Sequence, residues 1–533
     1  MKKAITMLIF ILILMGLSAC DGGSKSYTQF APIIKAIAVY QPGTFKPSAQ
    51  FQDMCENPRS GIDPYTGQGY PDIQGTVVDE NNWLRSWSNE LYLWYNEIDD
   101  VDPSTVNTPS EYFDLMQTFA TTPSGAPKDK FHFLMPTDEW RLHSQSGISA
   151  GYGAEFAIIK GSPPRTVVVA YTQPGSPATS AGVSLARGDT ILKVDGADLV
   201  NGNTQAIVDT LNAGLFPSTV GETHSFQVQR LSGLIETVTM TSAEITLVPV
   251  QNVGAISTAS GQVGYMLFNE YIATSEQQLI DAVNTLKGSG ITDLVLDLRY
   301  NGGGYLDIAN ELAFMLAGPA AASGQIFDEM QFNDKHTTHN PVTGQVLAPS
   351  YFRETAYGFS ATAGSSLPSL DLSRVFVLTG PGTCSASEAV INGLRGINVE
   401  VIQIGSTTCG KPYGFYPYDN CGTTYFSIQF KGVNAKGFGD YSDGFSPANA
   451  LAIKGEPVTG CAVADDYTHQ LGDPLEARLS AALQYRIDGT CPTPSGTGFS
   501  DVAAGQTFSQ PLLSASDGWI PKPVWLQNRI TGP

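Results

Sequence analysis

Helical periodicity marks the first organised stretch of this 533-residue chain. Apolar residues recur at three- and four-residue intervals from 79 to 98, at Trp83, Trp87, Leu91, Trp94 and Ile98. This spacing predicts an amphipathic helix with Asp79 as its N-cap. A second helix is expected over residues 110–119. Together they predict a small helical N-terminal unit over residues 79–140, with the aromatic stripe in its core.

From about residue 255 the pattern changes to strands that alternate with helices. Buried, β-branched runs predict strands at 263–268, 294–298, 375–379 and 399–404. Amphipathic segments predict helices at 275–286, 306–316, 386–394 and 474–485. A further strand is expected over 425–430. Alternating strands and helices favour an α/β layer, and we place this domain at residues 255–492.

Between these two stretches, residues 146–249 are β-rich. A strand at 167–170 and a strand-turn segment at 191–196 follow a glycine-rich turn that enters a strand. The order resembles a PDZ domain of the bacterial protease type, although a G-x-G-x-x-F turn also occurs in other β-barrels. The resemblance implies that backbone N–H groups of the turn hold a peptide's terminal carboxylate while the next strand pairs with the peptide. The turn residues are Gly151, Tyr152, Gly153, Ala154, Glu155 and Phe156.

Composition excludes one class of partner. The length of 533 residues suggests two to four domains. Hydrophobic residues make up 42% and charged residues 15% of the chain, as in globular proteins. The formal net charge of -21 argues against binding to nucleic acid, which requires clustered Lys and Arg.

The N-terminus has the pattern of a targeting segment. Lys2 and Lys3 precede an apolar run over residues 4–16, and Leu-Ser-Ala-Cys follows at 17–20. This resembles a bacterial lipoprotein signal, in which Cys20 would be lipidated; an ordinary secretory signal is the alternative. We therefore expect a signal peptide at 1–20 and an irregular tether at 21–78. The protein would be lipid-anchored in a bacterial cell envelope, facing the periplasm or the exterior. Residues 493–533 read as a peripheral tail.

The six cysteines that remain after Cys20 suit an oxidising compartment. Six cysteines allow fifteen pairings. Two pairs each bracket one compact segment, and we expect bonds Cys409–Cys421 and Cys461–Cys491. No C-x-x-C or paired His–Cys spacing suggests a metal, and no cofactor is expected.

Two turns carry candidate chemistry. The strand at 294–298 is followed by Asn-Gly-Gly-Gly at 301–304, whose glycines allow close approach to backbone N–H groups. The strand at 375–379 is followed by a Gly-Pro-Gly break and then by Ser385 at the start of a helix. The Ser385–Glu388 spacing is also that of a capping box, which needs no catalysis. A serine, Lys411 and a nest of backbone donors suffice for acyl transfer.

The combined motifs resemble the carboxyl-terminal processing (tail-specific) serine proteases. The resemblance rests on Asp-Leu-Arg-x-Asn-x-Gly-Gly at 297–304, Gly-Thr-x-Ser-Ala-Ser-Glu at 382–388 and Gly-Lys at 410–411. It implies a catalytic core of the ClpP–crotonase type that cleaves polypeptides with free C-termini. By position, Ser385 would be the nucleophile and Lys411 the general base. Further residues carry over as oxyanion-hole donors (Gly303, Ala386) and as supports of the site (Asp297, Arg299, Glu388).

One position departs from the family pattern. Many members have a glutamine four residues after the lysine, where this chain has Phe415. Two alternatives to a serine protease follow. In one, a non-catalytic envelope lipoprotein binds peptides or glycans through its PDZ unit and a degenerate protease fold. In the other, Cys384 is the nucleophile, although the sequence offers no histidine nearby.

Overall fold

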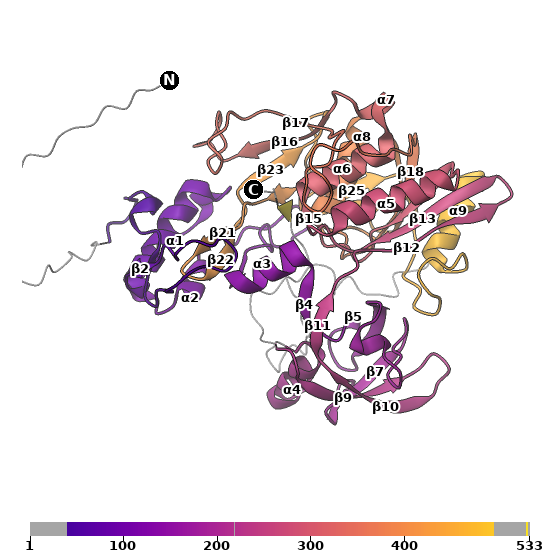
Figure 1. The fold of residues 1–533 in the computed structure, drawn as a ribbon, viewed down its shortest axis with the longest axis horizontal. Helices are drawn as coiled ribbons and strands as arrows, with labels where there is room; N and C mark the ends of the chain where they lie inside the picture. Colours follow the sequence, from indigo (N-terminus) through magenta and orange to yellow (C-terminus); the bar gives the residue numbers. More distant parts are fainter. Residues whose placement is uncertain (1–39, 218, 495–528, 531–533) are drawn as a thin grey trace, which may run out of the picture. The chain divides into compact units, whose positions relative to one another are not determined.

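The computed structural model describes residues 40–217, 219–494 and 529–530 (Figure 1). The predicted signal peptide and Cys20 lie outside these residues, as does nearly all of the predicted tail. In the described part of the chain, no helix combines the length and the apolar character that a membrane span requires.

A six-stranded sheet forms the centre of the α/β domain. Its strand order is β12-β13-β14-β18-β19-β26. The strands are β12 (Val250–Thr258), β13 (Gly261–Phe268), β14 (Asp293–Asp297), β18 (Arg374–Thr379), β19 (Glu400–Gly405) and β26 (Gly460–Ala462). β12 pairs with β13 antiparallel, and the other neighbours are parallel. The ends of β14 and β18 are therefore adjacent, as the sequence pattern required.

Alternate residues of these strands fill two hydrophobic layers. On β14, Leu294 and Leu296 pack with α5 (Ser275–Gly288), α6 (Leu306–Ala317) and α8 (Ala386–Gly396). Val295 faces the opposite layer, which includes α9 (Ala477–Asp488). Figure 1 shows these helices in magenta to orange and α9 in yellow. Because helices cover both faces of the sheet, the parallel strands have continuous apolar sequences.

The β-rich region has its own core and sheet. Its strand order is β10-β9-β7-β6-β5, with β8 beside β7. The elements are β5 (Ala154–Lys160), β6 (Thr166–Thr172), β7 (Thr190–Val194), β8 (Ala197–Asp198), α4 (Gln205–Leu215), β9 (Thr223–Gln229) and β10 (Ile235–Thr241). β4 (Ile148–Gly151) and β11 (Ala243–Thr246) pair antiparallel where the chain enters and leaves this unit. β5 is an edge strand of its sheet.

The N-terminal helices begin and end at residues other than those expected. α1 spans Val77–Leu91, and its N-cap is Thr76 rather than Asp79. Thr76 has extended backbone and its side chain accepts from the Asp79 N–H, while the Asp79 carboxylate accepts from the Thr76 N–H. Asp79 is thus the third helical residue of a capping box. A short 3-10 helix (Tyr95–Glu97) follows α1, and α2 covers only Pro109–Asp114.

This helical segment packs into the α/β domain. β3 (Phe133–Pro136) pairs antiparallel with β22 (Thr423–Phe426), and the Trp83 ring lies 5.2 Å from that of Tyr425. The strand expected over 425–430 is interrupted: β22 ends at Phe426, and β23 (Phe430–Val433) joins another sheet. That sheet has the strand order β17-β16-β23-β20. The other three strands are β16 (Ile326–Phe332), β17 (Ser350–Tyr351) and β20 (Tyr413–Gly414).

Short elements complete the described chain. The helices are α3 (Thr137–Ser146), α7 (Pro319–Ala322) and three further 3-10 turns (Ser48–Gln50, Pro103–Thr105, Pro177–Thr179). The strands are β1 (Met54–Cys55), β2 (Ile73–Gln74), β15 (Gly304–Tyr305), β21 (Tyr418–Asn420), β24 (Phe445–Pro447), β25 (Glu456–Val458) and β27 (Arg529–Ile530).

Three disulfides connect the six cysteines. Cys461–Cys491 is bonded as expected. The expected Cys409–Cys421 bond is wrong: Cys421 bonds Cys55, 366 residues away, and Cys409 bonds Cys384. The bond from Cys55 fixes part of the predicted tether to the α/β domain, which proximity along the sequence could not reveal.

Candidate active site

Ser385 lies in a strained turn at the start of α8. Its φ of 59° is in the left-handed region, which side-chain-bearing residues seldom adopt. Two hydrogen bonds tie this turn to the segment that follows β14. The Thr383 hydroxyl donates to the Leu298 carbonyl at 2.7 Å, and the Cys384 N–H donates to the Asn301 carbonyl at 3.0 Å. Strain of this kind at a buried polar side chain is typical of functional sites.

The capping interpretation does not account for the Ser385 hydroxyl. Glu388 accepts from the Ser385 N–H at 2.9 Å, which is one half of a capping box. The Ser385 Oγ is buried and has no hydrogen-bond partner in the described structure. A buried hydroxyl without a partner costs free energy, so the turn presents this oxygen for some purpose other than capping.

Glu388 ties the Ser385 turn to the loop that carries Lys411 (residues 406–412, the lysine loop). One carboxylate oxygen accepts from the Thr408 hydroxyl at 2.5 Å and the Gly410 N–H at 2.9 Å. The other accepts from the Lys411 N–H at 2.8 Å as well as from Ser385. Burial raises the pKa of Glu388, and these four donors oppose that rise. Because every neighbour donates, the group is placed to act as a carboxylate acceptor.

We expect Glu388→Gln to weaken this junction. An amide has one acceptor oxygen, so its NH₂ group would face two of the four donors. The free energy of unfolding should fall by about 2–3 kcal/mol, and any hydrolysis that depends on the site should fall with it. Urea denaturation measures the first effect. Glu329→Gln, on an exposed residue of β16, is the matched control; equal stability of the two variants would contradict this role for Glu388.

The Cys384–Cys409 disulfide makes a second, covalent connection between the same two segments. Cys384 immediately precedes Ser385, and Cys409 lies two residues before Lys411. The Cys409 N–H also donates to the Thr383 carbonyl at 3.0 Å. Both thiols are used in the bond, so this cluster with Glu388 does not offer thiolate ligands to a metal.

Lys411 is buried between aromatic rings. Only 1% of the Lys411 surface is exposed to solvent. The Nζ lies 4.5 Å from the ring centre of Phe415 and 4.7 Å from that of Phe131. Phe415 therefore faces the amine, but its side chain offers it no oxygen or nitrogen. The amine does not hydrogen-bond the Ser385 hydroxyl in this structure.

The two expected oxyanion-hole donors differ in their environment. Ala386 is the first residue of α8, where the backbone N–H has no partner within the helix. The Gly303 N–H instead donates to the Asn301 side-chain oxygen at 2.9 Å, and the Asn301 amide is held by the Phe268 carbonyl at 3.0 Å. Ala386 is thus better placed than Gly303 to stabilise a developing negative charge.

A buried charge network supports the end of β14. Asp297 accepts from the Arg299 Nε at 2.9 Å and from the Tyr265 hydroxyl at 2.7 Å. Arg299 also donates to Glu476 at 2.8 and 2.9 Å and to Asp465 at 2.6 Å. Against the effect of burial, the Asp297, Asp465 and Glu476 carboxylates raise the pKa of Arg299 well above its usual range.

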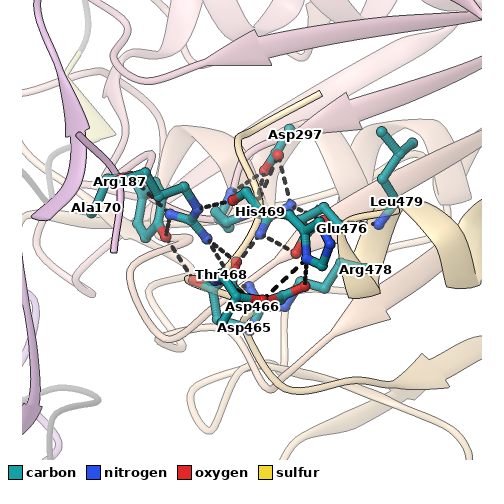
Figure 2. Close-up of polar contacts among 12 residues, drawn as sticks. Ala170, Arg187, Asp297, Asp465, Asp466, Thr468, His469, Glu476, Arg478 and Leu479 are labelled. Carbon is teal, nitrogen blue, oxygen red and sulfur yellow. Dashed lines mark hydrogen bonds and ion pairs between the residues drawn. The ribbon is translucent and has the colours of Figure 1, made fainter. Parts of the chain in front are cut away.

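The network extends into the β-rich unit (Figure 2). Arg187, which follows the 3-10 turn of that unit, donates to Asp465 at 2.7 Å and to the Tyr300 hydroxyl at 2.6 Å. Tyr300 in turn donates to Asp465 at 2.7 Å. Burial alone would raise the pKa of Asp465, but Arg478, Arg299 and Arg187 hold it far below its usual range. The sequence motifs indicated Asp297 and Arg299 but gave no signal for Asp465 or Glu476.

The glycine-rich turn leads into β5, the edge strand of the β-rich unit. Gly153 has φ 72°, and its carbonyl accepts from the Gln173 N–H at 2.7 Å. The buried Tyr152 donates its hydroxyl to the Gly214 carbonyl at the end of α4. Ala154 and Glu155 begin the edge strand β5, and Phe156 packs into the core of the unit.

Lys130 is a residue that the sequence analysis missed. It lies just before β3, and its Nζ donates to the Cys409 carbonyl of the lysine loop at 2.8 Å. Burial lowers the pKa of Lys130, while the Glu388 and Asp443 carboxylates oppose the shift. A single lysine in a loop belongs to no motif, so only the folded structure brings it to the site.

A comparison with protein families matches residues 262–417 to peptidase family S41. This part of the chain is similar to the peptidases of that family. The matched range includes Gly303, Ser385 and Lys411. The chain is homologous to carboxyl-terminal-processing proteases. The Picosynechococcus enzyme of that name is 28% identical over 294 residues, which cover 53% of this chain and 60% of that one.

Other relatives extend the comparison. The chloroplastic C-terminal processing peptidase of Tetradesmus obliquus is 31% identical over 182 residues, 32% of this chain and 38% of its own length. The chain therefore spans less than two thirds of the length of these curated relatives. A Bacteroides fragilis crystal structure, described as a candidate S41 protease, aligns over 79% of this chain and 98% of its own, with 25% identity and a TM-score of 0.56. The S41 protease fold is thus shared along most of the chain.

Proposed function

We propose that this protein is a serine endopeptidase of the bacterial cell envelope that cleaves polypeptides near their C-termini. The observation that carries the proposal is the Ser385 hydroxyl: it is buried, without a hydrogen-bond partner, in a strained turn that Glu388 ties to the loop of Lys411. The S41 match and the homology to carboxyl-terminal-processing proteases support peptide hydrolysis as the reaction.

Lys411 acts as the general base in this proposal. Its amine removes the Ser385 proton, and the Ser385 oxygen forms a bond to the carbonyl carbon of the peptide. The Ser385–Lys411 hydrogen bond forms as substrate enters, since such contacts are often long in unliganded enzymes. The resulting ammonium gives its proton to the leaving amine. Water then attacks the acyl-enzyme by the same route and releases the acid.

Backbone donors stabilise the oxyanion of each tetrahedral intermediate. The Ala386 N–H is in position at the start of α8, where the helix dipole also favours negative charge. Gly303 contributes once its contact to Asn301 opens. One such donor is worth about 3–4 kcal/mol of transition-state stabilisation. Asp297, Arg299 and Glu388 support these turns without touching substrate.

The β-rich unit is proposed to be a PDZ domain that captures the substrate's C-terminus. The open edge of β5 can pair with an extended peptide, and the turn at 151–153 would receive the terminal carboxylate. We expect a peptide with a free C-terminus to have a lower KM than the same peptide as its C-terminal amide, with similar kcat. Steady-state kinetics on the matched pair test this; equal KM values would contradict capture through the carboxylate.

Localisation follows from the proposed signal at residues 1–20. Three disulfides in the described chain suit an oxidising compartment outside the cytoplasm. Lipidation of Cys20 would hold the enzyme at a membrane. Cys20→Ser should release the protein into the soluble envelope fraction; membrane retention of that variant would contradict the lipid anchor.

A further inference from the structure

The buried Lys411 and the half-buried Lys130 both lie near the same aromatic ring. The Phe131 ring centre is 4.7 Å from the Lys411 Nζ and 5.5 Å from the Lys130 Nζ. Lys130 reaches the site from the N-terminal part of the chain, and its donation to the Cys409 carbonyl anchors it on the lysine loop. The two ring distances place the amines no more than about 10 Å apart.

The surroundings of Lys411 favour its charged form in two ways. The faces of Phe131 and Phe415 attract a cation. The Glu388 carboxylate, which binds the Lys411 backbone N–H, adds negative charge. A general base needs the opposite, an amine without its extra proton. Burial works in that direction, and so does a neighbouring positive charge.

Other charged groups near the two lysines are already engaged. Asp443 accepts from the Thr122 and Ser124 hydroxyls, and Asp129 accepts from the Tyr92 hydroxyl. Asp440 pairs with Lys431. Burial, the largest cause, raises the pKa of Tyr413, two residues after Lys411, above its usual range, so this phenol stays neutral. Glu388 is the carboxylate bound directly to the lysine loop.

We propose that Lys130 is a positioning residue for catalysis, whose retained positive charge keeps the neighbouring Lys411 amine unprotonated and able to accept the Ser385 proton. The inference rests on the proposed function, because it assigns the electrostatic partner of the general base. Two like charges in one buried site lose their protons in separate steps that belong to the pair. The first proton leaves at lower pH than it would from a single lysine.

Three variants separate charge from anchoring. Lys130→Arg keeps a cation and a donor, Lys130→Gln keeps a donor without charge, and Lys130→Met keeps neither. The measurement is the pH profile of kcat/KM for peptide hydrolysis by the full-length protein. We expect the acid limb to move up by about 1 pH unit in the Gln and Met variants, the size expected for like charges about 10 Å apart at an effective dielectric constant of about 20. The acid limb of the Arg variant should stay near that of wild type.

Lys128→Met is the matched control. Lys128 lies two residues away, pairs with Glu97 at 2.6 Å and is partly exposed, so its profile should equal that of wild type. Thermal unfolding shows which variants fold. If Lys130→Met does not fold, Lys130→Gln, which can keep the hydrogen bond to the Cys409 carbonyl, provides the neutral variant for the test. An unshifted acid limb in Lys130→Gln, or an equal shift in Lys130→Arg, would overturn the inference.

The same experiment distinguishes this inference from the proposed function. If wild-type hydrolysis survives Lys411→Ala, the proposed dyad fails, and the role of Lys130 fails with it. If hydrolysis requires Lys411 but the Lys130→Gln profile is unshifted, only the role of Lys130 fails.

Discussion

Replacing Ser385 by alanine should lower kcat/KM for peptide hydrolysis by at least about 10³-fold. The hydroxyl is buried and forms no hydrogen bond in the described structure, so its removal leaves no partner unsatisfied. The variant should therefore fold with unchanged or slightly higher stability. A large loss of rate without a loss of stability is the expected signature of a nucleophile.

Ser387→Ala provides the matched control for this prediction. Ser387 lies two residues further along, at the start of α8, and its hydroxyl donates to the Asn301 carbonyl at 3.2 Å. It should lose stability of about 1 kcal/mol and retain most of the rate. Wild-type hydrolysis by Ser385→Ala, measured with the same peptide, would remove this serine from the mechanism.

Replacing Arg299 by methionine should have the largest effect on stability. The substitution leaves the Asp297 and Glu476 carboxylates buried without their cation. Asp465 loses one of the three arginines that surround it. Breaking a buried pair from one side costs about 3–5 kcal/mol. Urea denaturation at pH 7 measures the loss.

The same substitution has an expected pH dependence. Without Arg299 the buried carboxylates bind protons more readily, so the variant's deficit should shrink as the pH falls. Arg395→Met, which breaks a partly exposed pair with Glu456, should cost no more than about 1 kcal/mol. Equal losses in the two variants would contradict a dominant role for the network around Arg299.

Hydrophobic periodicity predicted the central sheet closely because its strands and helices are locally encoded. The predicted strand at 375–379 differs from β18 by one residue, and the helix expected from 386 begins there. Asp79 failed as an N-cap because Thr76 and Asp79 form one capping box, and the sequence alone did not decide which residue opens it.

Features that depend on distant residues could not be predicted in this way. Cys55 bonds Cys421 across 366 residues, and spacing along the chain carries no information about such a pair. Lys130 reaches the lysine loop only because β3 pairs with β22. The Gly303 N–H was expected to face a substrate, but a side chain two residues away, that of Asn301, accepts it.

The non-catalytic alternative required Ser385 to be a capping residue and Lys411 to be an exposed loop charge. The structure buries Lys411 and leaves the Ser385 hydroxyl without a bond to the helix. Cys384 is part of a disulfide and so offers no thiolate as a nucleophile.

Reaction of the protein with a fluorophosphonate, followed by mass-spectrometric mapping of the adduct, tests the Ser385–Lys411 pair most directly. Our account predicts a single adduct on Ser385 that forms rapidly in wild type and very slowly in Lys411→Ala. An adduct on another residue, or equal rates of Ser385 labelling in the two proteins, would contradict it.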